Sequence, residues 1–335
     1  MKEESRNTRD RDKESKLIPV VMLNLFQHRV ELGEGKLMEN TIESEGMHYE
    51  GNCIRPPPEA YSILLQVTLG CSHNKCTFCG TYRDKPFRIK DDDIILSDIL
   101  FASKHMKRQD RVFLMDGDAL IIPQKRLMWI LGKIKEHLPW VKRVGTYANT
   151  KSIRMKSPQE LVELRKNGLD KIYLGVETGD DEVRKKINKG SSAQQCLEMG
   201  KKVKDAGLEL IVMVLLGVAG KLKSLDHARA TGKLLSDMDP SYVAALTVIL
   251  IPGTPLWEDY ERGDFELPDE RGLLIEMKEM IAHTNLSSGI FASNHASNYL
   301  SVKVHLPEGK QEVLDLIDAA LRGEIGLKPE WMRAF

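Results

Sequence analysis

Residues 62–80 read SILLQVTLGCSHNKCTFCG, and the interpretation of the whole chain starts from them. The apolar run at 62–69 has the length and composition of a buried strand. Cys71, Cys76 and Cys79 follow within nine residues, on a loop flanked by glycines that allow tight backbone turns. Thiolates this close on one loop can converge on a metal centre. The loop has no fourth cysteine, so a cubane cluster held here would keep one iron without a protein ligand.

With this loop, the chain resembles the radical S-adenosylmethionine (radical SAM) superfamily. Members carry three cysteines and an aromatic residue directly before the last one, where Phe78 stands here. Their usual spacing is Cys-x3-Cys-x2-Cys; longer first gaps also occur, and this loop reads Cys-x4-Cys-x2-Cys. The resemblance implies that Cys71, Cys76 and Cys79 ligate a [4Fe–4S] cluster, whose open iron binds S-adenosylmethionine (SAM).

The resemblance also implies an activity, in which these cysteines are the catalytic residues as well as the metal ligands. One electron from the reduced cluster cleaves SAM to methionine and a 5′-deoxyadenosyl radical, which abstracts hydrogen from a substrate. The protein would supply orientation and a pocket that excludes water. An electron donor such as a flavodoxin or ferredoxin is expected. The sequence does not identify the substrate.

Composition limits the partners and the compartment. Three of the five cysteines share one loop, which indicates a reducing compartment and metal chemistry rather than a disulfide framework. Basic and acidic residues number 49 each, so no net charge points to nucleic acid or an anionic membrane. No apolar run approaches the roughly 20 residues that cross a bilayer, and residues 1–16 lack the order of a signal peptide. We expect a cytoplasmic protein with no membrane partner.

Strand and helix patterns alternate along the middle of the chain, which predicts a parallel sheet with right-handed crossovers. Strands are predicted at 62–69, 111–115, 142–148, 171–176, 208–216 and 242–250, and helices at 91–108, 124–137, 157–168, from 181, and at 192–206, 224–238 and 310–321. Six strand–helix units between 61 and 283 fit an α/β fold, a partial TIM-type (β/α)6 barrel, as the resemblance implies. After residue 290 we expect little strand.

Three regions are predicted. Residues 1–46 are charged and rich in Gly and Glu toward their end, so we expect a poorly ordered, mostly irregular extension. Residues 47–290 would form the radical SAM core, and residues 291–335 a helical tail that packs on the barrel.

Reactive residues of parallel α/β barrels gather where strands end, and the second and third predicted strands end in suitable groups. Asp116-Gly117-Asp118 follows the second strand. In the family, a glycine-rich motif with an acid at this place holds the amino group of SAM, and Gly117 and Asp118 resemble it. Tyr147 and Asn149, after the third strand, are polar groups that could line the pocket.

The later strands end in further motifs of this kind. Residues 175–179 resemble a segment of the subgroup related to coproporphyrinogen dehydrogenase and the Elongator catalytic subunit, and Asn188-Lys189-Gly190 also matches that subgroup. Glu177 could accept hydrogen bonds from the ribose or amino group of SAM. Gly217 would let the backbone approach adenine, or would only form a tight turn. Pro252 and Gly253 are similar to a family segment near the adenine edge.

Three alternatives stay open. A structural zinc site could use the three loop cysteines with His73. An electron carrier could recruit Cys53 as a fourth ligand and close the cluster, although Cys53 and Cys196 are better explained as core residues or free thiols. Radical chemistry on RNA is the third, against which neutral charge argues.

Polar residues in the tail form a weaker candidate group. His295, Asn298 and Tyr299 could close the mouth of the barrel and contact substrate. A structural role for the histidine is the competing interpretation.

Overall fold

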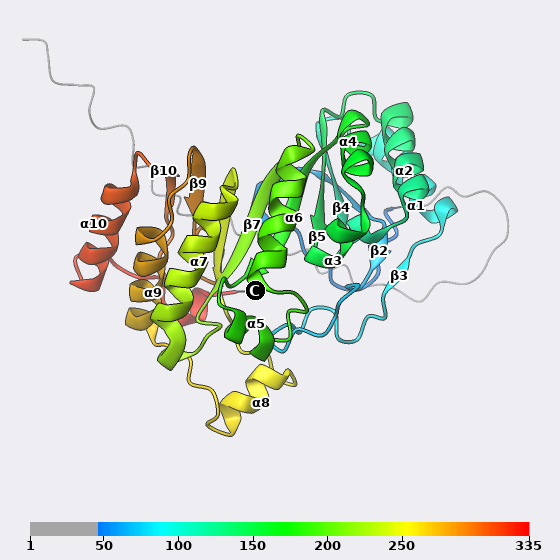
Figure 1. The fold of residues 1–335 in the computed structure, drawn as a ribbon. Helices are drawn as coiled ribbons and strands as arrows, with labels where there is room; N and C mark the ends of the chain where they lie inside the picture. Colours follow the sequence, from blue (N-terminus) through cyan, green and yellow to red (C-terminus); the bar gives the residue numbers. More distant parts are fainter. Residues whose placement is uncertain (1–45, 335) are drawn as a thin grey trace, which may run out of the picture. The chain divides into compact units, whose positions relative to one another are not determined.

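A computed structural model describes residues 46–334, so the expected N-terminal extension lies outside the described residues except for Gly46. One sheet of eight strands dominates the described chain (Figure 1). In spatial order its strands are β1 (Ile63–Gln66), β4 (Arg111–Met115), β5 (Arg143–Ala148), β6 (Leu169–Glu177), β7 (Glu209–Leu216), β8 (Tyr242–Thr247), β9 (Gly289–Ala292) and β10 (Lys303–Leu306). Neighbours are parallel from β1 to β9, and only β10 is antiparallel.

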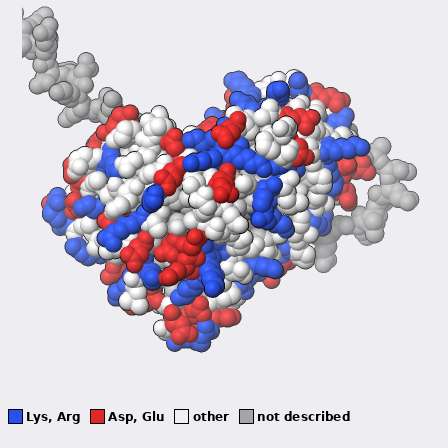
Figure 2. Space-filling view, in the orientation of Figure 1, with Lys and Arg blue, Asp and Glu red and all other residues white. Residues whose placement is uncertain are grey.

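Helices connect the parallel strands, as right-handed crossovers require. The connecting helices are α1 (Asp92–His105), α2 (Gln124–His137), α3 (Thr150–Met155), α4 (Pro158–Lys166), α5 (Asp181–Lys186), α6 (Ala193–Asp205), α7 (Ser224–Met238), α8 (Pro255–Glu261) and α9 (Glu270–Ala282), and α10 (Lys310–Leu321) follows the last strand. Adjacent helices pack side by side, α1 with α2, α6 with α7, and α7 with α9 (Figure 1). Both signs of charge occur across the face that they form (Figure 2).

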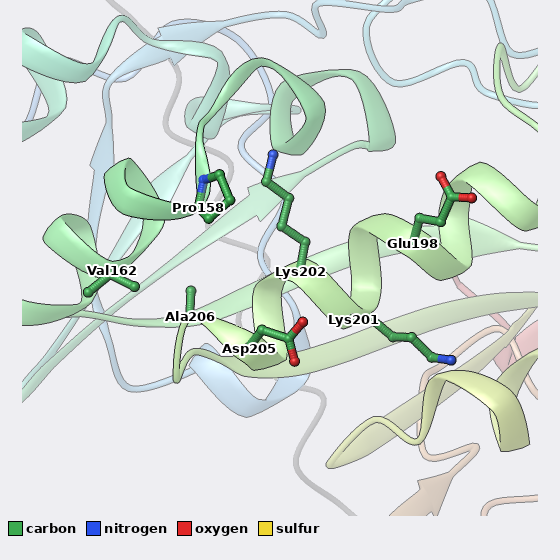
Figure 3. A pocket seen from close by; sticks show the side chains of 7 residues that line it. All are labelled: Pro158, Val162, Glu198, Lys201, Lys202, Asp205 and Ala206. Carbon is green, nitrogen blue, oxygen red and sulfur yellow. The ribbon is translucent and has the colours of Figure 1, made fainter.

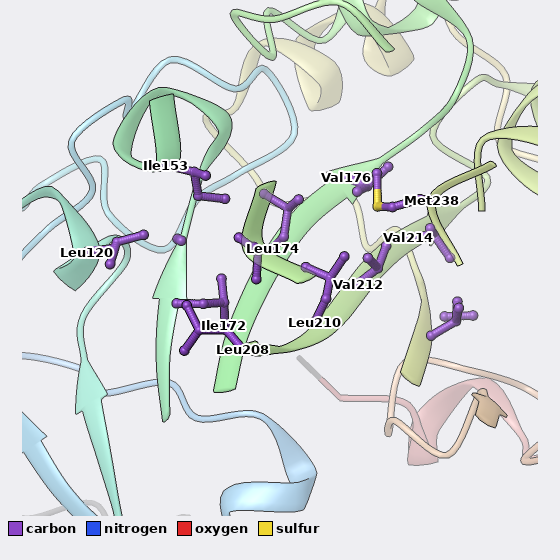
Figure 4. Packing of buried hydrophobic residues seen from close by; sticks show 14 of the residues in the cluster. Leu120, Ile153, Ile172, Leu174, Val176, Leu208, Leu210, Val212, Val214 and Met238 are labelled. Carbon is purple, nitrogen blue, oxygen red and sulfur yellow. The ribbon is translucent and has the colours of Figure 1, made fainter. Parts of the chain in front are cut away.

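The main core lies between the sheet and these helices, and it follows the two-residue period of a strand. On β6, Ile172, Leu174 and Val176 are buried among the helical side chains (Figure 4). Tyr173, between them, belongs to a separate cluster on the opposite, inner face of the sheet. Each such aliphatic side chain contributes roughly 1.5–3 kcal/mol on burial.

The inner face is aromatic near its centre. The rings of Phe113 and Tyr147 meet edge to face with centroids 4.9 Å apart, and Phe113 meets Tyr173 in the same way at 5.3 Å. The Tyr173 hydroxyl donates to the buried carboxylate of Glu59 at 2.5 Å, from the single turn Pro57–Glu59. Packed rings and a buried carboxylate therefore fill this part of the inner face.

The predicted partial α/β barrel is confirmed, with two differences of detail. The run predicted as one strand at 62–69 divides into β1 and β2 (Thr68–Leu69), and β2 pairs with β3 (Arg88–Ile89). β9 and β10 occupy a region where little strand was expected, because four residues give too short a pattern to detect. The predicted division at residue 290 stays a prediction, and β9 runs across it. Among the described helices, none has the length and apolar character to span a bilayer.

Candidate functional site

The loop that carries the three cysteines is fixed by backbone hydrogen bonds to the ends of other strands. Gly117, after β4, donates to the carbonyl of Gly70 at 3.2 Å. Thr77, inside the loop, donates to Ile187 O at 3.0 Å and accepts from Leu256 N at 3.1 Å. The loop is thereby tied to segments that follow β4, β6 and β8, so it lies at the carboxyl edge of the sheet.

Polar side chains on the loop make further contacts. His73 Nε2 lies 2.6 Å from the carbonyl oxygen of Asn188, and Asn74 Nδ2 donates to Tyr82 O at 2.7 Å. This contact directs the ring of His73 to the loop that follows α5.

Two predicted site residues meet the cysteine loop directly. Asp118 is fully buried, and its Oδ2 accepts from Ser72 Oγ at 2.5 Å and from Asn149 Nδ2 at 2.8 Å. Its other oxygen, Oδ1, is buried without a hydrogen-bond partner. Burial raises the pKa of Asp118 to about 6, against the hydrogen bonds from Ser72 and others. A buried carboxylate oxygen without a partner is free to accept a hydrogen bond from a bound ligand or from water.

The cysteines themselves are free thiols, each partly buried. Burial raises the pKa of Cys71, and it raises the pKa of Cys76 to about 11 although Lys189 acts in the opposite direction. Iron binds thiolates, so a bound cluster would have to supply the positive charge that removes these protons. The donor set is therefore three soft sulfur ligands on a rigid loop, which fits an iron–sulfur cluster.

No group of three His, Cys, Asp or Glu side chains within residues 46–334 is gathered as around a single metal ion. A mononuclear zinc site needs such a group. In a cubane cluster each thiolate binds a different iron, and three cysteines on one loop can supply three of these ligands.

Glu177 lies at the end of β6 in a left-handed conformation, with φ of 62°. Its Oε1 is 2.7 Å from Nζ of Lys189, and both side chains are mostly buried. Burial alone would lower the pKa of Lys189, but the carboxylate of Glu177 and the nearby Cys76 outweigh it and raise the pKa. Lys189 was not predicted as a site residue. The only signal was its place in the Asn-Lys-Gly pattern.

Asp116 is a further residue near the cysteine loop that the sequence analysis did not predict as part of the site. It is fully buried, its Oδ2 accepts from Gly70 N at 3.0 Å, and its Oδ1 has no partner. Burial raises the pKa of this carboxyl. Tyr147, a predicted site residue, stands on the same inner face of the sheet. In the sequence, an acidic residue directly after a strand indicates a turn, and nothing further distinguished Asp116.

The remaining predicted residues lie in two places. Gly217 has φ of 80°, and a Cβ there would be 2.9 Å from Leu273 Cδ2, so packing against α9 accounts for this glycine. Phe78 packs in a small cluster beneath the cysteine loop. Pro252 and Gly253 are exposed beside that loop, where Gly253 O accepts from Arg83 Nη1 at 2.6 Å.

The polar group in the tail is occupied by internal contacts. Asn298 is 3% exposed; its Nδ2 donates to Ala245 O at 2.8 Å and its Oδ1 accepts from Thr247 Oγ1 at 2.8 Å. The Tyr299 ring lies under the guanidinium of Arg333, 4.2 Å from the ring centroid. These contacts favour a structural role over substrate binding.

A pocket of about 310 Å³ opens elsewhere, between α4 and α6 on the helical face (Figure 3). Its lining residues are Pro158, Val162, Glu198, Lys201, Lys202, Asp205 and Ala206. None of them belongs to the strand ends or to the cysteine loop, and the pocket takes no part in the candidate site.

Comparison with known families adds one finding. Residues 65–221 match the model of the radical SAM superfamily. This stretch begins in β1 and includes the cysteine loop, Asp118, Asn149 and Glu177.

Curated relatives are distant. An uncharacterised protein of Methanocaldococcus jannaschii is 23% identical over 67% of this chain and 71% of its own length. An uncharacterised methyltransferase of Pyrococcus horikoshii is 23% identical over 58% of this chain and 41% of its own. The heme chaperone HemW of Bacillus subtilis is 24% identical over 60% and 53%, respectively. The chain thus spans less than two thirds of the last two proteins.

Solved structures with similar folds include methylornithine synthase (PylB), with a TM-score of 0.49 and 19% identity over 67% of this chain and 63% of that one. Coproporphyrinogen III oxidase (HemN) from Escherichia coli has a TM-score of 0.48 and 14% identity, over 66% and 51%.

Proposed function

We propose, from the membership of residues 65–221 in the radical SAM superfamily, that this enzyme holds a [4Fe–4S] cluster on Cys71, Cys76 and Cys79 and binds SAM at the remaining iron. When bound, these groups would supply reductive cleavage of SAM to methionine and a 5′-deoxyadenosyl radical that abstracts hydrogen from substrate. The observation that carries the proposal is the loop of three free thiols, tied by its backbone to the segments after β4, β6 and β8.

The chain's own residues would bind SAM around that loop. The unpartnered Oδ1 of Asp118 can accept from an amino or hydroxyl group, while Asn149 holds the same carboxylate in place. Gly117 lets the cysteine loop lie close to the backbone after β4, since a Cβ there would be 2.8 Å from Cys71 Cβ. The pair of Glu177 and Lys189 offers an acceptor for ribose or amino hydrogens and a cation for the SAM carboxylate.

Other residues would shape the pocket. Tyr147 would line it from the inner face, next to an aromatic cluster that keeps water out. Phe78 would support the cluster loop from below, and Pro252 and Gly253 would flank the adenine. Gly217 would contribute by allowing the tight turn after β7, since Leu273 of α9 fills the space that a side chain at this position would need.

The biological setting belongs to the same proposal. A reduced cluster needs an electron donor, such as a flavodoxin or ferredoxin, and free thiols need a reducing compartment, for which the cytoplasm is suitable.

Metal analysis tests the proposal. After anaerobic reconstitution with iron and sulfide, we expect about four irons and four sulfides per chain, as a [4Fe–4S] cluster contains. Cys71→Ala, Cys76→Ala and Cys79→Ala should each lose most of this iron while the circular dichroism of the barrel is retained.

Two matched controls separate the alternatives. Cys196→Ala removes a buried thiol of α6, away from the loop, and should leave the iron content unchanged. Cys53→Ala should also leave it unchanged; loss of iron in that variant would favour the four-cysteine electron carrier. One zinc per chain and no sulfide would contradict the proposal.

A further inference from the structure

A strained turn positions Glu177. Thr178 N donates to Val176 O at 2.8 Å, which closes a γ-turn around Glu177, and the φ of 62° there is the left-handed form of that turn. Turns of this form are rare and cost of order 1–3 kcal/mol, so they persist only where surrounding contacts enforce them. The sheet register also shifts between Gly175 and Glu177.

The first enforcing contact comes from Arg184 of α5, which is 2% exposed. Its Nη1 donates to the carbonyls on both sides of the turn, Val176 O and Thr178 O, each at 2.8 Å. Its Nε donates to Ser191 O at 2.7 Å, so the guanidinium is itself held in place.

The second contact comes from α7, through a fully buried histidine. Nδ1 of His227 lies 2.7 Å from Thr178 Oγ1, directly behind the turn. Thr178 Oγ1 already accepts from Asp180 N at 3.0 Å, so its own hydrogen is free to be donated to Nδ1. With Thr178 as the donor, Nδ1 of His227 is the unprotonated ring nitrogen and Nε2 carries the hydrogen.

Glu276 of α9 extends the same network to the next strand. Its carboxylate is fully buried, with Oε1 3.4 Å from His227 Nε2 and 2.7 Å from the amide of Gly217 that donates to it. Oε2 accepts from Ser224 Oγ. Among the described residues Nε2 of His227 makes no hydrogen bond, so the bond that joins α7 to Glu276 is the one from Ser224. The helices α7 and α9 lie side by side in Figure 1, and His227 on α7 contacts the turn after β6 while Glu276 on α9 contacts the turn after β7.

A buried polar group without a partner costs about 1–3 kcal/mol or more, and in the part of the chain that the structure describes His227 Nε2 is such a group. The side chains of His227 and Glu276 contact Thr178, which follows Glu177, and Gly217, respectively. Glu177 and Gly217 are both residues that we assign to the SAM site.

We propose that His227 and Glu276 are positioning residues for SAM. His227 holds the turn after β6 in its strained form, together with Arg184 on the other side of that turn. Glu276 holds the turn after β7 and lies against His227. The carboxylate of Glu177 is thereby already in position for SAM, so binding SAM does not require the turn to change conformation. The inference rests on the proposed SAM site.

The test uses the full chain with its cluster reconstituted. Thr178→Val and His227→Leu each remove the hydrogen bond and keep a similar volume. We expect SAM, measured by equilibrium dialysis, to bind about tenfold more weakly to each. Iron content and the rate of SAM cleavage at saturating SAM should stay at wild-type values, so the change falls on affinity alone. His227→Asn, which keeps an acceptor near Nδ1, should restore most of the affinity.

A second readout needs no cluster. In the same variants without iron, amide hydrogen exchange across residues 176–179 should be faster than in wild type. Thr284→Val is the matched control, since it removes an equally buried hydroxyl beyond the C-terminus of α9. It should change neither SAM binding nor this exchange.

Each outcome is decisive. Wild-type SAM affinity in Thr178→Val and His227→Leu with intact iron overturns the inference, as does an equal loss in Thr284→Val. Failure of the wild-type holoprotein to bind SAM at all overturns the proposed function and this inference with it. If His227→Leu does not fold, Thr178→Val with its exchange readout decides alone.

Discussion

Gly117 lies against the cysteine loop so closely that a side chain has no room there. A Cβ at this position would stand 2.8 Å from Cys71 Cβ and 2.9 Å from Tyr82 Cε2. These neighbours belong to a loop and a buried ring that cannot move independently of the cluster ligands.

Gly117→Ala is therefore expected to lower the iron bound after reconstitution and to cost about 1–3 kcal/mol of stability by overpacking. Gly132→Ala is the matched control, because nothing lies within 4 Å of its Cβ position in α2. It should keep full iron content and gain up to about 1 kcal/mol from helix propensity. Iron assays and urea unfolding measure both effects, and equal iron content in the two variants would contradict the expectation.

His295 provides a prediction on pH. Burial and the nearby Lys328 lower its pKa from 6.5 to about 4, and Ser297 N donates to its Nδ1 at 3.1 Å, which requires that nitrogen unprotonated. Because the folded state takes up the proton later than the unfolded chain does, stability is complete above pH 6.5 and falls as the pH drops toward 4.

The loss over that range should reach up to about 3 kcal/mol. In His295→Asn, which keeps an acceptor but cannot titrate, the free energy of unfolding should decline less steeply between pH 6.5 and 4. Urea titrations at several pH values give the two curves, which should run parallel above pH 7. Parallel curves over the whole range would show that this histidine does not control the slope.

At this scale the sequence predicts residues whose role follows from their place after a strand. Asp118 and Asn149 are predicted in this way, and in the structure both contact Ser72; their role in binding SAM stays a prediction. His227 and Glu276 could not be found, since they sit within helices and act on turns dozens of residues away. Only tertiary contacts reveal them.

Among the elements, the ends of β8 and β9 are joined through one side chain. Asn298 donates to Ala245 O in β8 at 2.8 Å and to Ser293 O, just after β9, at 2.9 Å. Asn298→Ala would leave these buried carbonyls and the Thr247 hydroxyl with fewer partners.

The expected cost of Asn298→Ala is about 2–4 kcal/mol, from a buried group that makes several hydrogen bonds. Iron content and SAM affinity should not change. Denaturant unfolding and dialysis measure the two properties. A stable variant with altered SAM or substrate behaviour would instead support the interpretation that this residue contacts a ligand.

Helices and strands were predicted correctly where the residues that begin or end them lie within the same short segment. The helix predicted from Ser157 begins with a capping box, in which Ser157 and Glu160 each satisfy the other's backbone amide. β9 and β10 were not predicted because they are short and because their pairing, β9 with β8 and β10 with β9, is set by the sheet. A four-residue segment gains its strand conformation from its neighbours.

For the whole molecule, the parallel order of β1 to β9 places every strand end on one edge, and the superfamily resemblance is confirmed over residues 65–221. Binding at that edge should therefore stabilise the fold as a unit. With SAM at 100 times its dissociation constant, we expect about 2.7 kcal/mol of added stability in the reconstituted protein. Thermal unfolding with and without SAM measures it, and Cys71→Ala should show a much smaller shift.

The most direct test of the account is product analysis under anaerobic conditions. Reconstituted protein incubated with SAM and dithionite should yield 5′-deoxyadenosine and methionine, identified by mass spectrometry, and Cys71→Ala should yield neither. Wild-type protein that holds a full [4Fe–4S] cluster yet leaves SAM intact, or a Cys71→Ala variant that still forms 5′-deoxyadenosine, would contradict it.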